Sequence, residues 1–458
     1  MSDKVSEKRR SVFVKKKELY EAESQGKLLY GVEDNPPAAV GFVMGIQNIL
    51  TAFGGIVAVP LIIAGMAGAN VADTAYLVSA ALLCSGICTI IQSRGIGMSP
   101  FRIGSGLPTI MGTDFGFVAP ASTIIVGMGG GLPAYFGASI LGAILEFILS
   151  YFVKPLLKFF PQVVTGTVIT LIGMTLVPVT FDWAAGGVGA ADYGSVENLG
   201  IALIVFVIII LLNRYGKGFV SSASVLIGIV VGYIICIPLN KVDFNQVIEA
   251  SWFAPPSIFK FGVNFDLKFV IPFIAGYLVT VIETIGVVQV VGEVTETEVT
   301  DDMIANGVRA DAFGSFLSPF FGSGPVATFS QNAGLIPLTK VASRSVAIIS
   351  GVLLILISLF PKIATIVSIM PPAVLGGAGI LMFGTVAASG IQNLSLVKFT
   401  NRNLIIIASS LTIGLGVTFK PEIVENLPTV LNALFSSGIS AGTITAFVLN
   451  IILKEEKE

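Results

Sequence analysis

The sequence predicts an all-α polytopic membrane protein, and three observations carry this prediction. Apolar residues make up 54% of the 458 residues and charged residues only 12%, whereas soluble domains carry about 25% charged residues. Apolar runs of about 20 residues, the length that a helix needs to cross a bilayer, recur along the chain and give about fourteen segments. Two of these runs are interrupted by glycine and proline at corresponding places in the two halves. The chain therefore uses lipid as its main solvent.

The apolar runs begin after a polar, Lys-rich segment, residues 1–33. We expect this segment to be a cytoplasmic tail and not a signal peptide, because the next apolar run is too long and lacks a small-residue cleavage pattern. The expected spans have their centres near Gln47, Ala81, Met111, Ala143, Ile172, Val207, Val230, Ala275, Ser315, Gln331, Ile348, Leu375, Ser410 and Ile444.

Charges between these runs predict the orientation of the chain. Alternate connections, starting with the N-terminal tail, carry Lys or Arg with little acid, and the intervening connections carry acidic or mixed charge. Because Lys and Arg favour the cytoplasmic side, we expect a cell inner (plasma) membrane protein with both termini in the cytoplasm. The acidic connection from Glu293 to Asp302 falls on the same side, and acidic residues count little in this rule. The basic residues are Arg94, Arg102, Lys154, Lys158, Arg214, Lys217, Lys340, Arg344, Lys398 and Arg402.

Composition excludes several classes of function. The chain has no histidine, which excludes histidine-based catalysis and histidine proton relays. Cys84, Cys88 and Cys236 lie in apolar runs without a second metal-binding motif, so we expect buried thiols, no metal and no cofactor. A net charge of −2 gives no basic surplus for nucleic acid. A membrane-embedded enzyme would need a nucleophile–base pair or a metal cluster, and the sequence suggests neither.

Two segments differ from ordinary spanning helices. One reads GSGLPTIMGTDFG from Gly104 to Gly116, and the other reads GSGPVATFSQNAG from Gly322 to Gly334. Both open with Gly-Ser-Gly and place a proline soon after, which disfavours a continuous helix. Paired broken segments in two halves are typical of the binding site of a transporter built from inverted repeats. Two kinked structural helices are the alternative, and a channel is disfavoured because nothing resembles a repeated selectivity filter.

Carboxylates within the apolar runs are candidate site residues, because a charged group is costly inside a membrane. Glu283 lies in VTVIETIGVVQVV with apolar turns on both sides, and Asp114 lies in the first broken segment. Asp311 lies close to Arg309, and Glu146 lies in ILGAILEFILS. For Asp311 and Glu146 a structural role is the alternative to a functional one.

The second broken segment carries side chains that suit a planar, polar heterocycle. Gln331 and Asn332 offer a donor and an acceptor side by side, which matches the cis-amide edge of a ring. Phe115 or Phe329 would stack on the ring, and Glu283 would accept its N–H groups in a dry cavity. This combination fits a sugar less well and a hydrophobic drug poorly.

The stretch QNAGLIPLTKVASR, from Gln331 to Arg344, resembles the signature Gln-(Asn/Glu/Pro)-x-Gly-x4-Thr of the nucleobase–ascorbate transporter (nucleobase:cation symporter-2) family. Asn332, Gly334 and Thr339 also fit this signature. The stretches GIQNILTAFGGIVAVPLII, ETIG, RAD and GTVAASGIQNL are similar to the family, so the resemblance covers the chain after the tail. The Gln-Asn form resembles the xanthine/urate permease branch, whereas the uracil branch usually shows Gly-Glu-Asn.

The resemblance implies two inverted repeats of about seven segments each, in which segments 3 and 10 are broken into a short strand and a half helix. It also implies a core domain that holds the substrate and slides, in an elevator motion, against a gate domain that makes a homodimer contact. The implied core is residues 34–160 and 241–361, the implied gate is 161–240 and 362–453, and 454–458 is a cytoplasmic tail.

The resemblance further implies a purine site and a network that couples it to proton entry. The residues implied for substrate binding are Glu283, Gln331, Phe115, Phe329, Ser330 and Asn332. The residues assigned to proton coupling or conformational change are Asp311, Glu283, Asn48 and Thr339.

The sequence departs from the family pattern in three places. It reads Gln47-Asn48 where the family often has Gln-His, and Val287 stands where purine carriers often have Asp. Both changes remove a titratable group, so the proton-carrying carboxylate stays open. Asp114 replaces the Asn or Ser that often precedes the stacking aromatic residue. We therefore add Asp114 to the substrate-binding residues and expect it to act in discrimination or protonation.

These observations predict a secondary transporter, not an enzyme, that imports xanthine or urate by proton symport. Hypoxanthine and guanine differ from these purines by one or two substituents and stay open as substrates. A uracil permease or a sodium-coupled nucleobase carrier of the same fold is the alternative. An anion carrier of the related sulfate/bicarbonate type is disfavoured, because Glu283 would oppose an anion that the half-helix N-termini attract. The expected partners are a purine base, the lipid bilayer and a second copy of the chain.

Overall fold

The apolar runs form long helices, and the computed structural model describes residues 28–156, 161–217, 219–428, 431–432, 435 and 437–453. The predicted C-terminal tail and residues 1–27 of the predicted N-terminal tail lie outside these ranges. The first half contains α2 (Ala38–Met66), α3 (Val71–Arg94), β1 (Met111–Thr113), α4 (Val118–Ser122), α5 (Gly131–Tyr151), α6 (Val153–Leu156), α7 (Gln162–Thr175), α8 (Val177–Ala184), α9 (Val196–Tyr215), α10 (Phe219–Ser222) and α11 (Ser224–Cys236). The second half contains α12 (Asn245–Glu249), α13 (Val270–Val294), α14 (Asp301–Phe321), β2 (Val326–Thr328), α15 (Leu335–Thr339), α16 (Arg344–Ser358), α17 (Pro361–Ser368), α18 (Pro372–Leu394), α19 (Asn401–Phe419) and α21 (Gly438–Ile452).

The membrane-spanning character predicted from composition is confirmed. Within the described residues, eight helices are long and apolar enough to cross a membrane, or up to nine if the bent pair α16 and α17 is one span. Shorter apolar helices, Phe115–Gly127, Ser224–Cys236 and Gly438–Ile452, supplement them. Each span centre predicted from the sequence falls within a helix, a strand or a helical turn.

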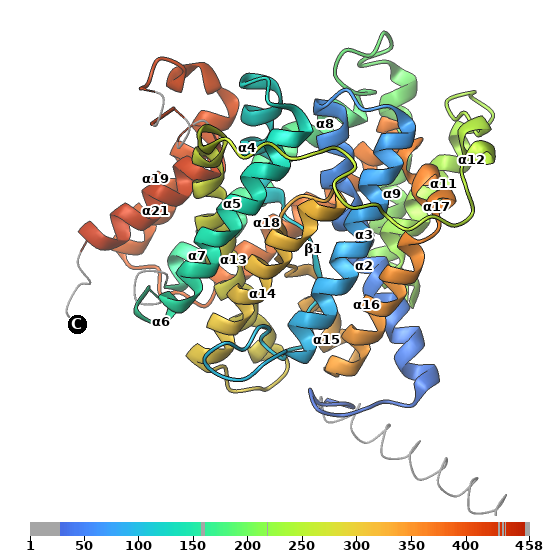
Figure 1. The fold of residues 1–458 in the computed structure, drawn as a ribbon. Coiled ribbons are helices and arrows are strands. Elements are labelled where there is room, and N and C mark those ends of the chain that lie inside the picture. The colour runs from blue at the N-terminus through green and yellow to red at the C-terminus, as the bar shows by residue number, and fades with distance from the viewer. Residues whose placement is uncertain are drawn as a thin grey trace, which may run out of the picture.

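The two halves repeat one order of elements: two long helices, a short strand with a short helix, and a third long helix. In the first half these are α2, α3, β1–α4 and α5, and in the second half they are α13, α14, β2–α15 and α16. The strands β1 and β2 pair antiparallel in the middle of the molecule, with Gly112 opposite Ala327 (Figure 1). The antiparallel pairing sets the two halves in opposite directions, which is the inverted repeat that the broken segments predicted.

Glycine and proline explain why both broken segments leave the helical conformation. Gly104 and Gly106 adopt φ angles of 103° and 80°, and Gly322 ends α14 at 86°. Residues with a Cβ rarely adopt such angles. After each strand the backbone turns helical again, as the half helix Phe115–Gly127 in the first half and the half helix Gln331–Thr339 in the second. The strand-plus-half-helix form predicted for these segments is therefore confirmed.

Small residues let the long helices cross closely. A Cβ on Gly86 of α3 would lie 2.5 Å from the carbonyl oxygen of Gly351 of α16, and a Cβ on Gly351 would lie 2.7 Å from that of Gly86. Gly173 of α7 and Gly390 of α18 make a similar close crossing against the facing backbone. Such backbone contact is a common way to pack helices in a membrane. Apolar side chains gain little free energy by moving from lipid to a helix interface, because lipid tails are equally apolar.

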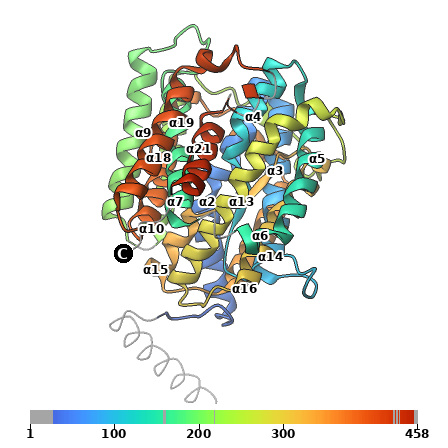
Figure 2. The same cartoon turned by 90° about the vertical axis from the view of Figure 1, so that its left-hand side faces the viewer.

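The helices gather in two groups. In Figure 2, α7, α9, α18 and α19 lie on the left and α3, α5 and α14 on the right, with α13 between them. The broken segments pack with α2, α3 and α13. This arrangement accords with a core and a gate, whose exact boundaries remain predictions.

Ion pairs join connections that the charge pattern assigned to one side of the membrane. On the side opposite the N-terminal segment, the hydrogen bond from Lys241 lowers the pKa of Asp192 below its usual range. On the side of the N-terminal segment, Leu29 N–H donates to the carbonyl of Lys340 at 2.7 Å. The ion pairs are Lys260–Asp73 at 2.8 Å, Lys241–Asp192 at 2.9 Å and Lys154–Asp302 at 2.9 Å.

Candidate functional site

A cavity of about 640 Å³ lies where the second broken segment faces α13 and α18. Its inner wall includes Ser330 and Gln331, and Gly55 of α2 lies beside them. Glu293 and Leu338, near the ends of α13 and α15, also line it, so the cavity extends toward the face that carries the N-terminal segment. The volume is in the range of small-molecule sites.

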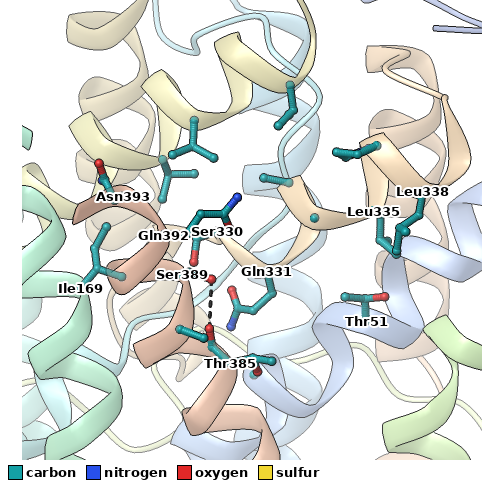
Figure 3. Close-up of a pocket in the computed structure, with 18 of the residues that line it drawn as sticks. Thr51, Ile169, Ser330, Gln331, Leu335, Leu338, Thr385, Ser389, Gln392 and Asn393 are labelled. Carbon is teal, nitrogen blue, oxygen red and sulfur yellow. Dashed lines mark hydrogen bonds between the residues drawn. The ribbon is translucent and has the colours of Figure 1, made fainter. Parts of the chain in front are cut away.

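Gln331 is the first residue of the second half helix, and its side chain lies in this cavity (Figure 3). The half helix begins after Ser330, whose side chain makes no capping hydrogen bond. No hydrogen bond joins the Gln331 carboxamide to any described residue. The carboxamide is thus available to a ligand with both its donor and its acceptor.

Phe329 fixes the position of these two residues but does not line the cavity. Its ring is 4% exposed and fills a notch in which a Cβ on Gly112 would lie 2.3 Å from Cζ. Its backbone N–H donates to the carbonyl of Ile110 at 2.8 Å. Phe329 therefore holds the second strand against the first, and its predicted contact with substrate stays a prediction.

Glu283 lies on α13, one turn before the cavity-lining residues Gly286 and Val287. Its side chain is largely buried, with 9% of the residue exposed, and it makes no hydrogen bond or ion pair with the described residues. A carboxylate without a partner in such a place is costly unless a ligand or a proton satisfies it. Gln331 thus offers a free polar group inside the cavity, and Glu283, which does not itself line the cavity, offers one about a helical turn from its wall.

Asp114 occupies the end of the first half helix. One carboxylate oxygen accepts a hydrogen bond from the Gly116 N–H at 2.7 Å, and the other accepts one from the Thr280 hydroxyl of α13. Phe115 is also buried, with its ring edge-to-face against Phe383 of α18 at a centroid distance of 4.9 Å. Neither Asp114 nor Phe115 lines the cavity.

Asp311 of α14 is fully buried in a network of hydroxyl and amide groups. It accepts hydrogen bonds from the hydroxyls of Thr284 and Thr328, the latter at 2.8 Å. The Gln92 amide of α3 donates to Thr328 at 2.8 Å and reaches Asp311 at 3.4 Å. Arg309 points elsewhere, to the carbonyl of Arg102 at 3.0 Å. The network ties α3, α13, α14 and β2 together, which suits the predicted conformational role.

Asn332, Asn48 and Thr339 lie behind the second half helix, around a separate small pocket. The Asn332 amide donates to the backbone carbonyl of Asn48 at 3.0 Å, which ties the half helix to α2. Thr339 donates to the carbonyl of Leu335 at 2.9 Å within α15. None of the three side chains lines the main cavity, so the predicted contact of Asn332 with substrate stays a prediction.

Glu146 of α5 is fully buried, and neither carboxylate oxygen has a hydrogen-bond partner among the described residues. Its helix α5 packs against α14, which carries Asp311, and against α13, which carries Glu283. The electrostatic influence of Asp311 and Asp114 reaches Glu146, but it does not line the cavity. No described Lys or Arg makes an ion pair with any of these four carboxylates.

Sequence reasoning missed the opposite wall of the cavity, which α18 provides. Thr385, Ser389 and Gln392 line this wall and face Gln331 across the cavity in Figure 3. The Ser389 hydroxyl donates to the carbonyl of Thr385 at 3.0 Å, so its lone pairs remain available. The spacing of four and three residues within an apolar helix places the polar groups on one face, and this pattern was the signal.

Comparison with known proteins decides the family. Residues 41–423 match the sequence profile of a family described as "Permease family", Xan_ur_permease. The chain belongs to this permease family. The match confirms the nucleobase–ascorbate transporter family that the Gln331–Thr339 motif predicted, and the permease is a multi-pass membrane protein.

The permease is similar to curated relatives over most of its length. It is 54% identical over 428 residues to the "Putative purine permease CPE0397" of Clostridium perfringens (strain 13 / Type A), which covers 93% of each chain. It is 40% identical to the xanthine permease of Bacillus subtilis (strain 168), covering 89% of this chain and 92% of that one. It is also 40% identical to the uric acid transporter UacT of Escherichia coli (strain K12), covering 89% and 85%.

Solved structures confirm the fold of the permease. The transmembrane domain of the cyanobacterium bicarbonate transporter BicA matches with a TM-score of 0.61 and 15% identity, over 85% of this chain and 98% of that one. The murine Slc26a9 anion transporter in the inward-facing state matches with a TM-score of 0.59 and 11% identity, over 92% and 69%. At these identities the likeness concerns the fold alone.

Proposed function

We propose that this permease is a secondary active transporter that imports a purine base, xanthine or urate or both, by proton symport. One observation carries the proposal: Gln331 lines the cavity with its carboxamide free, and Glu283, one turn before the cavity-lining Gly286 and Val287, has no partner among the described residues. A carboxylate accepts ring N–H groups and a carboxamide pairs with a cis-amide edge, and oxopurines present both. The names of two relatives, a xanthine permease and a uric acid transporter, support the same substrate class.

The transport step we propose is an elevator-type movement in which the helices around the strand pair carry the site past α18. The cavity is bounded on one side by the second broken segment and α13, and on the other by α18 and the start of α11. It extends toward the face that carries the Lys-rich N-terminal segment, which the positive-inside rule assigns to the cytoplasm of an inner (plasma) membrane protein. We therefore propose that this conformation is the inward-open state of a carrier.

A homodimer is part of the proposal. Helices α9 and α19 bury only 28% and 22% of their spanning windows inside the chain. Their exposed apolar side chains suit contact with lipid or with a second copy. Cross-linking in native membranes would distinguish a dimer from a monomer.

The test is uptake of radiolabelled xanthine into proteoliposomes with an imposed pH gradient, acidic outside. We expect accumulation above equilibrium that a protonophore abolishes, with urate, hypoxanthine and uracil added as competitors to rank the substrates. Uptake that follows a sodium gradient, or strong competition by uracil and none by purines, would instead support the alternative carriers of the same fold. Absence of uptake of every nucleobase would refute the proposal.

A further inference from the structure

The charges around the cavity are all of one sign. Among the described residues that line it, Glu293 at the mouth is the one charged side chain, and no Lys or Arg contributes. Glu283 lies on α13 one turn before Gly286 and Val287 of the lining, and its carboxylate has no partner among the described residues. Asp114, Asp311 and Glu146 are buried carboxylates that do not line the cavity, and no described Lys or Arg pairs with them.

The first half helix would be the natural place for an anion, because its N-terminus carries free N–H groups and a partial positive charge. Asp114 already holds this end: it accepts the Gly116 N–H at 2.7 Å and the Thr280 hydroxyl. Thr280 lies on α13 one turn before Glu283. At the first half helix, the protein's own carboxylate thus takes the position that a ligand anion would need.

The neutral and anionic forms of a purine would interact very differently with this cavity. A neutral oxopurine donates ring N–H groups to Glu283 and pairs with Gln331. The anion has lost one of these donors and adds a negative charge beside carboxylates in a medium of low dielectric constant, where repulsion is strong. No described cation at the cavity offsets that repulsion.

We propose, on the basis of the proposed function, that the cavity binds purines in their electrically neutral form. Urate is therefore carried only together with the proton that neutralises it. The inference concerns which ionic form enters the site, so it applies whichever carboxylate accepts the coupling proton. Asp114 is the residue through which this chain sets the preference, because it places a carboxylate at the end of the first half helix.

The ionisation of the ligands provides the test. Urate becomes an anion across the mildly acidic range, whereas xanthine loses its first proton at higher pH. Binding of radiolabelled urate and xanthine to the full-length protein in lipid nanodiscs is measured across the mildly acidic to neutral range in which urate ionises. Because apparent affinity follows the competent fraction, we expect the urate-to-xanthine affinity ratio to fall about tenfold for each pH unit once the anion dominates.

Asp114→Asn is the variant that isolates the residue. Asparagine keeps an oxygen for the Gly116 N–H, and its amide can donate to Thr280, whose hydroxyl can donate to the carbonyl of Gly276 at 3.1 Å. Removing the charge should raise the urate-to-xanthine ratio at about pH 7 by about tenfold, equivalent to about 1.4 kcal/mol. Glu298→Gln, which removes an exposed carboxylate on the same face away from the cavity, should leave the ratio unchanged.

The outcomes separate the two proposals. A urate-to-xanthine ratio that stays constant across the pH series in the wild-type protein overturns the neutral-form inference, whatever the variants do. A falling ratio that Asp114→Asn and Glu298→Gln alter equally would overturn the role assigned to Asp114. Absence of both xanthine and urate binding at every pH would overturn the proposed function itself, and the inference with it.

Discussion

The two broken segments share one architecture but differ at the point where each strand passes into its half helix. In the first, Asp114 caps the half helix and the next residue, Phe115, packs edge-to-face on Phe383. In the second, Ser330 makes no capping hydrogen bond and the next residue, Gln331, faces the cavity. The first half helix is capped by a side chain of the chain, and the second opens without a side-chain cap at the cavity, where we propose that the ligand binds.

This difference shows how an inverted repeat yields a single site. Two equivalent half-helix ends near the strand pair would offer two binding positions, but one is filled by a carboxylate of the chain. Thr280 and Thr284 extend the contrast along α13, since they donate to Asp114 and to Asp311 while Glu283 between them stays free. The free groups are therefore concentrated on the side of the second segment.

From the contrast between the two broken segments, we expect the largest effect, a loss of purine affinity, when the unpartnered side chains Glu283 and Gln331 are changed. Glu283→Gln should reduce purine affinity by about 10- to 100-fold, because a hydrogen bond to a charged group contributes about 1.5–3 kcal/mol. Gln331→Ala should weaken binding as well, whereas Gln246→Ala, a matched change on α12 away from the cavity, should have no effect. Equilibrium binding of radiolabelled xanthine in nanodiscs measures all three variants. Wild-type affinity in Glu283→Gln would contradict the assignment of Glu283 to the site.

We expect the second-largest effect, a loss of stability, from a substitution in the β1–β2 strand pair. A Cβ on Gly112 would lie 2.3 Å from Cζ of Phe329 and 2.6 Å from Cε2. Gly112→Ala must displace the ring, and such overpacking costs about 1–3 kcal/mol. Gly334→Ala, in the second half helix, meets no heavy atom within 4 Å and serves as the control. Thermal unfolding in detergent compares them, and equal melting temperatures would mean that Phe329 does not pack against β1 as described.

Particular residues show how far the sequence predicts this molecule. Gly104, Gly322 and the prolines after them marked both broken segments, because special φ angles and a missing donor can be read from residue type alone. The Gln331 motif likewise indicated the residue that faces the cavity. What the sequence could not show is which neighbour satisfies a buried group, because hydrogen bonds such as Thr280 to Asp114 join residues far apart in the chain.

Asp114 and the α18 wall illustrate this limit from opposite directions. Asp114 was predicted to bind substrate because a carboxylate beside a stacking aromatic residue suggests a site; it does not line the cavity and caps the first half helix, so its contact with substrate stays a prediction. Thr385 and Ser389 were not predicted, because small hydroxyl residues occur in many membrane helices without a ligand. Only the packing of α18 against the second broken segment gives these hydroxyls a cavity to face.

We expect the smallest effect, again on stability, when the Asp114 cap of the first half helix is removed. Asp114→Ala removes the acceptor of the Gly116 N–H, and losing such a cap costs about 0.5–2 kcal/mol. Asp114→Asn keeps the acceptor and should retain most of the stability. Ser330→Ala should cost less than Asp114→Ala, because the Ser330 side chain makes no capping bond. Unfolding of the three variants is followed in one detergent at one pH. If Asp114→Ala were as stable as Asp114→Asn, the capping role would be wrong, and the two broken segments would be more alike than their hydrogen bonds indicate.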